Sequence, residues 1–161
     1  IVMMKRVHED HKTQKRGKPH PLFVDLEACF FNQGATAICL QMPFVEKAVD
    51  LFEIFRDPNK IDSLEFSCIL LQIIAALKWL QSRDPAIIHR DLKPENILYD
   101  TVSGLIKLLD FGTARSLEDY TIAPAASWRN QERYGATGKR LSERVGTRGY
   151  QAPEIFESDL F

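Results

Sequence analysis

The sequence has little cysteine, no strong excess of charge of either sign and no apolar run of about twenty residues. Its three cysteines are widely spaced and form no metal-like pair, so we expect free thiols in a reducing compartment, cytoplasmic or nuclear. The formal net charge of -1 gives no electrostatic reason to expect direct binding of nucleic acid or of an anionic membrane. The lack of a long apolar run predicts no membrane span, and the first residues show no signal-peptide pattern.

What is present is typical of a globular chain or of part of one. The 161 residues are 45% hydrophobic and 27% charged, which is enough to bury a sizeable core. Two apolar runs, 22–31 and 36–44, are separated by a short segment that contains glycine, and together they predict a β-hairpin. Pro43 should end the second strand, because proline cannot donate to a sheet ladder. Residues 1–7 are also compatible with a strand.

Two helices are expected in the middle of the chain. The segment 45–55 has a short amphipathic pattern, and the segment 62–81 repeats apolar residues near the helical period. Asp62 and Glu65 have the spacing of a capping box at the start of the longer helix. The residues expected on its core-facing side are Leu64, Ile69, Leu70, Ile73, Ile74, Leu77 and Leu80.

The second half of the chain alternates short apolar segments with polar loops. The segments 96–100 and 105–111 predict a second hairpin, turning at Ser103 and Gly104. From 116 to 144 the sequence is polar and aperiodic. A loop of that length in a compact domain is usually functional or disordered.

Three polar motifs follow one another in this half: HRDLKPEN at 89–96, DFG at 110–112 and APE at 152–154. The three occur in this order, with a predicted hairpin between the first two and a long loop before the third. In this pattern the sequence resembles the protein kinase family. The resemblance implies an α+β, two-lobed protein-kinase-like fold, incomplete in this chain, and a phosphoryl transfer that depends on ATP and Mg²⁺.

The resemblance implies a role for each polar residue of these motifs. Asp91 would accept or orient the proton of the attacking hydroxyl, and Lys93 would stabilise the transferring phosphoryl group. Asn96 and Asp110 would hold Mg²⁺, a cation that prefers oxygen ligands. Arg90 would pair with a phosphate on the activation segment.

Further residues have supporting roles by the same resemblance. His89 and Phe111 would join an apolar stack that links the two lobes. Lys93 and the segment 146–154, GTRGYQAPE, look like the serine/threonine-specific members of the family. There Thr147 would bridge to the catalytic aspartate and lysine.

The nucleotide site is expected in the first part of the chain, where ICLQMPFVEK looks like the last strand of the small lobe running into the hinge. The hinge residues that would face adenine are Met42, the gatekeeper, with Pro43, Phe44 and Val45 offering backbone groups. Residues 2–5, VMMK, resemble the V-A-I-K strand, which makes Lys5 the candidate ligand of the α- and β-phosphates. No glutamate that could fix Lys5 is apparent on a following helix.

By this resemblance the chain is a partial kinase domain. It divides into a small-lobe remnant at 1–42, a hinge at 43–46 and part of the large lobe at 47–161, with the activation segment at 110–154. The family's glycine-rich loop and the helices after Glu154 would lie outside it, so we expect the isolated chain to be inactive and poorly stable. Candidate phosphorylation sites in the activation segment are Ser116, Tyr120, Thr121, Ser127, Thr137 and Ser142.

Two alternative functions stay open. A pseudokinase, acting as a binding or scaffold module, is favoured by the missing glutamate and glycine-rich loop and opposed by the intact catalytic motifs. A kinase for small molecules is opposed by the segment 146–154, which resembles a peptide-docking segment. The hinge, the long activation segment and GTRGYQAPE look most like the cell-division-cycle-seven kinases. That likeness implies a protein substrate and an activating regulatory subunit.

Overall fold

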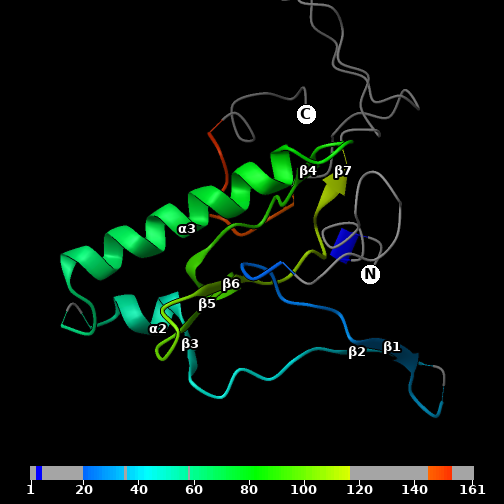
Figure 1. Cartoon of the computed structure of the whole chain (residues 1–161). Coiled ribbons are helices and arrows are strands. Elements are labelled where there is room, and N and C mark those ends of the chain that lie inside the picture. The colour runs from blue at the N-terminus through cyan, green and yellow to red at the C-terminus, as the bar shows by residue number, and fades with distance from the viewer. Residues whose placement is uncertain (1–2, 5–19, 35, 58, 117–144, 154–161) are drawn as a thin grey trace, which may run out of the picture.

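The computed structural model describes residues 3–4, 20–34, 36–57, 59–116 and 145–153. Within these residues the chain has an α+β arrangement of helices and short antiparallel strand pairs (Figure 1). The elements in chain order are β1 (Ala28–Phe31), β2 (Ile38–Gln41), β3 (Ala48–Asp50), α2 (Leu51–Phe55), α3 (Ser63–Gln81), β4 (Ile87–Ile88), the 3-10 helix η1 (Pro94–Asn96), β5 (Ile97–Asp100), β6 (Ile106–Leu108) and β7 (Arg115–Ser116).

The predicted first hairpin is confirmed as the antiparallel pair β1–β2, in which Ala28 lies opposite Gln41. Its turn is held by Asn32, whose Oδ1 accepts hydrogen bonds from the N–H groups of Thr36 and Ala37 at 2.8 and 3.0 Å. β2 ends at Gln41, two residues before Pro43. This agrees with the expectation that the proline, which has no N–H to donate to the sheet, would end the strand. Figure 1 shows this hairpin set apart from the sheet β3-β5-β6.

The helix expected over 45–55 is shorter than predicted. Residues 48–50 form β3, which pairs antiparallel with β5, and the helix α2 begins only at Leu51. Asp50 ends the strand and caps the helix, because its Oδ1 accepts the N–H of Glu53 at 2.9 Å. The 3.6-residue pattern is too short here to separate strand from helix, and pairing with a strand fifty residues away decides the outcome.

The longer helix α3 begins where the sequence predicts. Asp62 is its N-cap, accepting the N–H of Glu65 at 2.8 Å. The Glu65 carboxylate does not complete a reciprocal capping box: it accepts the buried hydroxyl of Tyr99 on β5. The start of the helix is therefore fixed both locally and to the sheet.

The buried side of α3 is narrower than predicted. Ile69, Ala76 and Leu80 are buried, whereas three residues expected in the core, Leu64, Leu70 and Ile74, are exposed, Leu64 by 74%. With apolar residues on both sides, α3 is long and apolar enough to cross a membrane by length and composition alone. The expectation of no membrane span stays a prediction. The finding is weak evidence for a span, since core helices of soluble proteins pass the same test.

One face of α3 is bound to the neighbouring β5–β6 turn through Gln72. Its Nε2 donates to the carbonyl of Gly104 at 2.8 Å, and its Oε1 accepts the N–H of Ile106 at 3.0 Å. The side chain thus pairs two backbone groups at the start of β6. Such pairing matters because a part-buried backbone group without a partner is costly.

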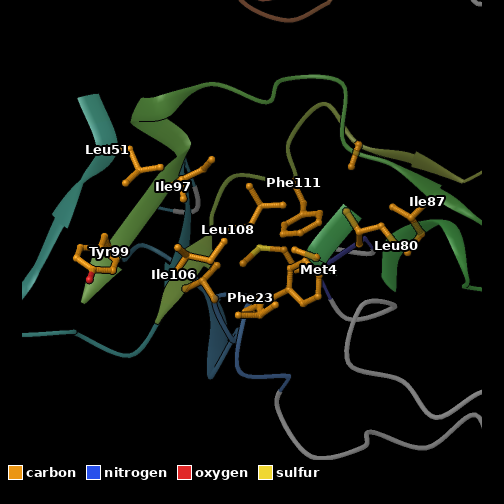
Figure 2. Packing of buried hydrophobic residues seen from close by; sticks show 14 of the residues in the cluster. Met4, Phe23, Leu51, Leu80, Ile87, Ile97, Tyr99, Ile106, Leu108 and Phe111 are labelled. Carbon is orange, nitrogen blue, oxygen red and sulfur yellow. The ribbon is translucent and has the colours of Figure 1, made fainter. Parts of the chain in front are cut away.

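The core gathers around β5 and β6 and the segment that precedes β1 (Figure 2). A parallel bridge joins Phe23 to Leu108, with the N–H of Leu108 donating to the carbonyl of Leu22 at 2.8 Å. Met4 is buried in the same cluster. Met3 and Met4 are helical, so the expectation of a strand over residues 1–7 is wrong at these two positions.

Candidate active site

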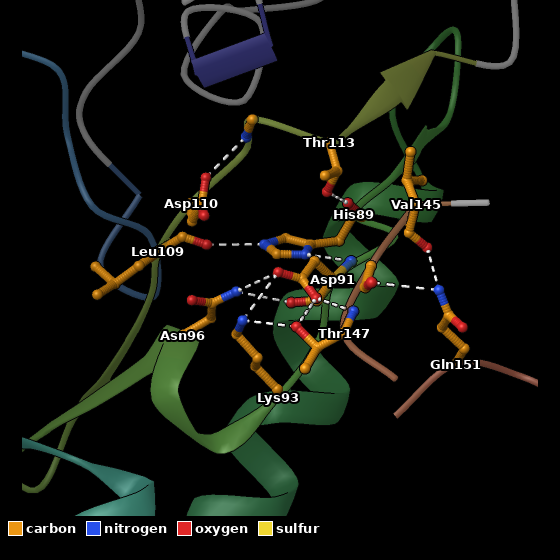
Figure 3. Close-up of polar contacts among 12 residues, drawn as sticks. His89, Asp91, Lys93, Asn96, Leu109, Asp110, Thr113, Val145, Thr147 and Gln151 are labelled. Atoms are coloured by element: carbon orange, nitrogen blue, oxygen red, sulfur yellow. Dashed lines mark hydrogen bonds and ion pairs between the residues drawn. The ribbon is translucent and has the colours of Figure 1, made fainter. Parts of the chain in front are cut away.

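The HRD-containing loop is held between two strands. β4 ends immediately before His89, and η1 closes the loop at Asn96. The carbonyl of Asn96 accepts the N–H of Leu109 at 2.8 Å, which joins the loop to the strand that leads to Asp110. The two motifs that the sequence places twenty residues apart therefore lie side by side (Figure 3).

His89 is the buried centre of this arrangement, with 4% of its surface exposed. Its Nε2 lies 2.8 Å from the carbonyl oxygen of Leu109, and its Nδ1 accepts the N–H of Asp91 at 3.3 Å. Because a carbonyl only accepts, the proton belongs on Nε2 and the ring is neutral. Burial lowers the pKa of His89, and the hydrogen bond to Leu109 and the charges of Asp110 and Asp91 offset only part of that effect.

Phe111 packs its ring edge-on against His89, with 5.0 Å between the ring centroids. Phe23 in turn packs against Phe111 at 6.0 Å. The expected contact of His89 with Phe111 is therefore present, and it extends to the segment before β1. Aromatic pairs of this edge-to-face kind stabilise a core beyond the area they bury.

Every acceptor position of the Asp91 carboxylate has a donor nearby. Oδ1 accepts the N–H and the hydroxyl of Thr147, each at 2.8 Å. Oδ2 accepts from Asn96 Nδ2 at 3.2 Å and lies 3.3 Å from Lys93 Nζ. Burial by itself raises the pKa of Asp91, but the hydrogen bonds from Thr147 and Lys93 outweigh it and hold the pKa below its ordinary value.

Thr147 bridges the catalytic-loop residues as the resemblance implies. Its hydroxyl donates to Asp91 and accepts from Lys93 Nζ at 2.7 Å. The side chains of Asp91 and Lys93 are only 10% and 21% exposed, so their charges face each other with little intervening solvent. The Asp91 carboxylate and the Lys93 ammonium group are thus held close together before any ligand binds.

Gln151 and Gly146 belong to the site, although the sequence analysis missed them. Gln151 Nε2 donates to the carbonyls of Val145 and Gly146, at 2.9 and 3.2 Å. Gly146 has a φ of 99°, and a Cβ there would lie 2.5 Å from the carbonyl oxygen of Arg90. The glycine beside Thr147 was a usable sequence signal, whereas nothing in the sequence marked Gln151.

Comparison with known proteins agrees with this geometry. A family model described as "Protein kinase domain" matches residues 2–160. The chain belongs to the protein kinase family.

Named relatives are similar over most of this kinase chain. It is 34% identical to "Mitogen-activated protein kinase 15" of Rattus norvegicus over 119 residues, 74% of this chain and 19% of the relative. It is 34% identical to "Serine/threonine-protein kinase tousled-like 1-B" of Danio rerio over 140 residues, 85% of this chain and 17% of the relative. It is 37% identical to "Cyclin-dependent kinase-like 2" of Oryctolagus cuniculus over 122 residues, 75% of this chain and 18% of the relative. The chain thus spans about a fifth of the length of these relatives.

A kinase site needs oxygen ligands for a divalent cation, and two described residues provide them. Asn96 commits its Nδ2 to Asp91, which leaves Oδ1 for a cation. Asp110 is exposed, adopts a left-handed φ of 51° and uses Oδ1 to accept the N–H of Gly112. The described residues contain no group of three or more His, Cys, Asp or Glu that could hold a metal ion. Two protein ligands fit Mg²⁺, which usually keeps waters and binds phosphates as well.

Arg90 connects the HRD-containing loop to Thr113, which directly follows the DFG motif. Its φ is 68°, a left-handed value that is uncommon for a residue with a side chain. Its Nε donates to the carbonyl of Thr113 at 2.6 Å, and the Thr113 hydroxyl donates to the carbonyl of His89 at 3.1 Å. Among the candidate phosphorylation sites, Ser116 is 1% exposed in β7 and therefore inaccessible. The other candidates lie outside the described residues.

The residues expected to form the hinge directly follow β2, and Met42 to Val45 belong to no helix or strand. Phe44 is 89% exposed, and neither its N–H nor its carbonyl bonds to another described residue. The carbonyl of Val45 accepts the N–H of Ala48 at 3.1 Å. Met42, the expected gatekeeper, is 44% exposed.

Lys5 and Glu154 lie outside the described residues. The V-A-I-K motif places its lysine on a strand, whereas Met3 and Met4 are helical. The conformation of these two residues therefore gives no support to the expected role of Lys5.

Proposed function

We propose that this chain is the core of a serine/threonine protein kinase that transfers the γ-phosphoryl group of ATP to protein hydroxyls. The observation that carries the proposal is the set of contacts among Asp91, Lys93 and Thr147. These contacts hold the Asp91 carboxylate and the Lys93 ammonium group at fixed positions on the same loop.

In the proposed reaction Asp91 orients the substrate hydroxyl and takes its proton as the oxygen attacks the γ-phosphorus. One P–O bond forms to the substrate, the bond to the β-phosphate oxygen breaks, and ADP leaves. Lys93 stabilises the negative charge on the equatorial oxygens, the main electrostatic demand of a loose phosphoryl-transfer transition state. Hydrogen bonds from Thr147 and Lys93 outweigh burial and lower the pKa of Asp91, so its carboxylate stays ionised at neutral pH although it is little exposed.

Asn96 Oδ1 and the Asp110 carboxylate are the proposed ligands of Mg²⁺, which when bound neutralises phosphate charge. The contacts of Asn96 to Asp91 fix its amide, so its oxygen points to one place. The exposed residue Phe44 and its neighbours Met42, Pro43 and Val45 are proposed to face adenine. Arg90 is proposed to meet a phosphate of the activation segment.

The proposed serine/threonine specificity is supported by Lys93, by the segment 146–154 and by the similarity to a tousled-like serine/threonine-protein kinase. The finer proposal is a cell-division-cycle-seven type of kinase with an activating regulatory subunit, and it rests on the sequence resemblance alone. A cytoplasmic or nuclear location is proposed because Cys29, Cys39 and Cys68 are free thiols.

The test uses the purified full-length protein with ATP, Mg²⁺ and a generic protein substrate. We expect phosphoserine and phosphothreonine in the substrate, loss of activity in Asp91→Asn, and loss of the Mg²⁺-dependent thermal shift with ATP in Asp110→Asn. Asp57→Asn is the matched control, because Asp57 lies in the loop after α2 and outside the contacts of the site. A wild-type protein that neither binds ATP with Mg²⁺ nor phosphorylates any substrate would be a pseudokinase, and the proposal would be wrong.

A further inference from the structure

The segment that carries Thr147 is shaped by a short chain reversal. The N–H of Tyr150 donates to the carbonyl of Thr147 at 3.0 Å, and Gly149 has a φ of 96°. The reversal brings the end of this segment back towards its first residues, so that Gln151 lies beside Val145 and Gly146. Figure 3 shows the Gln151 side chain reaching back to this stretch.

Gln151 then closes the reversal with one amide group. Its Nε2 donates to two successive carbonyls, those of Val145 and Gly146, and so bonds to the backbone immediately before Thr147. A primary amide has two N–H donors, which matches two carbonyl acceptors. The Gln151 side chain is half-buried, so water competes only in part for these acceptors.

The other side of the same stretch has no room to move. A Cβ at Gly146 would lie 2.5 Å from the backbone carbonyl oxygen of Arg90, so the segment is pressed against the catalytic loop there. Thr147, the next residue, directs both its N–H and its hydroxyl at Asp91 Oδ1. A shift of the Gly146 backbone would therefore change the Thr147–Asp91 distances directly.

We propose that Gln151 is a positioning residue: its amide holds the backbone of Val145 and Gly146 so that Thr147 keeps both of its hydrogen bonds to Asp91. Gln151 contacts none of the groups assigned to the reaction. It acts through Thr147 on the acceptor of the substrate proton. The kinetic consequence rests on the proposed kinase function, whereas the effect on the Thr147 N–H does not.

The experiment compares Gln151→Leu, Gln151→Glu and Gln151→Arg in the full-length protein. Leucine removes both donors, glutamate places a carboxylate against two carbonyl acceptors, and arginine restores donors on a flexible side chain. Amide hydrogen exchange of Thr147, read by NMR, reports the positioning, and steady-state kinetics report its effect. Losing two hydrogen bonds predicts about tenfold faster exchange and about tenfold lower kcat, with the KM for ATP changed less than about twofold.

Gln81→Leu and Gln81→Glu are the matched controls, since Gln81 is exposed at the end of α3. We expect both to behave as wild type and Gln151→Arg to recover most of kcat and of the protection of Thr147. The proposal is overturned if Thr147 exchange stays within about twofold of wild type in the leucine and glutamate variants. It is equally overturned if either variant unfolds or loses ATP affinity along with kcat, because Gln151 would then be a general structural residue. An inactive wild type would refute the proposed function, and the exchange measurement would still decide the role of Gln151.

Discussion

Replacing Thr147 by valine should expose how much the hydroxyl bridge contributes to the site. Valine has nearly the same shape and keeps the backbone N–H that donates to Asp91, but it lacks the hydroxyl that contacts Asp91 and Lys93. A hydrogen bond to a charged group contributes about 1.5–3 kcal/mol. If that contribution is realised in the transition state, kcat should fall roughly 10- to 100-fold.

The assay is steady-state phosphorylation of a protein substrate, paired with a titration of the Asp91 carboxyl by ¹³C NMR. The donors from Thr147 are a main cause of the depressed pKa of Asp91, so Thr147→Val should raise that pKa towards its ordinary value. In the wild type the ionised form persists to lower pH than in an unperturbed aspartate. In the Thr147→Val variant the Asp91 carboxylate should become protonated at a higher pH than in the wild type. The acid side of the pH–rate profile should shift to higher pH as well.

Thr147→Ser is the control, because serine keeps the hydroxyl and loses only a methyl group. It should retain most of kcat and the low pKa of Asp91. A valine variant with wild-type kcat, or with an Asp91 pKa that moves down, would refute the reasoning. Equal losses in the serine and valine variants would show that the fit of the whole threonine side chain, and not the hydroxyl alone, matters.

Three further outcomes follow from contacts outside the bridge. Gln72→Ala should lower the free energy of unfolding in urea by about 2 kcal/mol, since two part-buried backbone groups lose their partner, while Gln81→Ala should stay within about 0.5 kcal/mol. The free energy of unfolding should fall as the pH drops below about 6.5. Burial lowers the pKa of His89 in the folded state, so the unfolded chain takes up the proton at a higher pH than the folded chain. A His89→Gln variant whose urea midpoint keeps the same pH dependence would contradict this. The hydrogen bond to Glu65, with burial, raises the pKa of Tyr99 to about 12, so ultraviolet titration should show a late-ionising tyrosine signal that Tyr99→Phe removes.

Local patterns predicted the parts of the fold that local interactions determine. The hairpin β1–β2 follows from two apolar runs around a turn, and the start of α3 follows from Asp62, whose side chain acts within one helical turn. The motif residues HRDLKPEN, DFG and APE were identified through their resemblance to the protein kinase pattern, and the roles assigned to them stay predictions. These predictions needed no knowledge of distant contacts.

Distant contacts decided where the predictions differ from the structure. Residues 48–50 become a strand because β5 lies alongside, and Glu65 leaves its capping box for a tyrosine on that same strand. Leu64 was assigned to the core by period, but the helix buries only the side that faces β4 and β6. Gln151 was missed for another reason: its partners, Val145 and Gly146, are near in sequence but come into reach only through a chain reversal that no sequence pattern marked.

The close contact of Gly146 with the backbone of Arg90 predicts how mutations at this position will behave. Gly146 carries no side chain, yet every missense change of its codon adds a Cβ, and that carbon would meet the backbone oxygen of Arg90, which no side-chain rearrangement can move away. Its positive φ penalises the same substitutions a second time. In a saturation library selected for activity, codon 146 should therefore be as depleted of variants as codon 91, and an inherited change there should be read as loss of function.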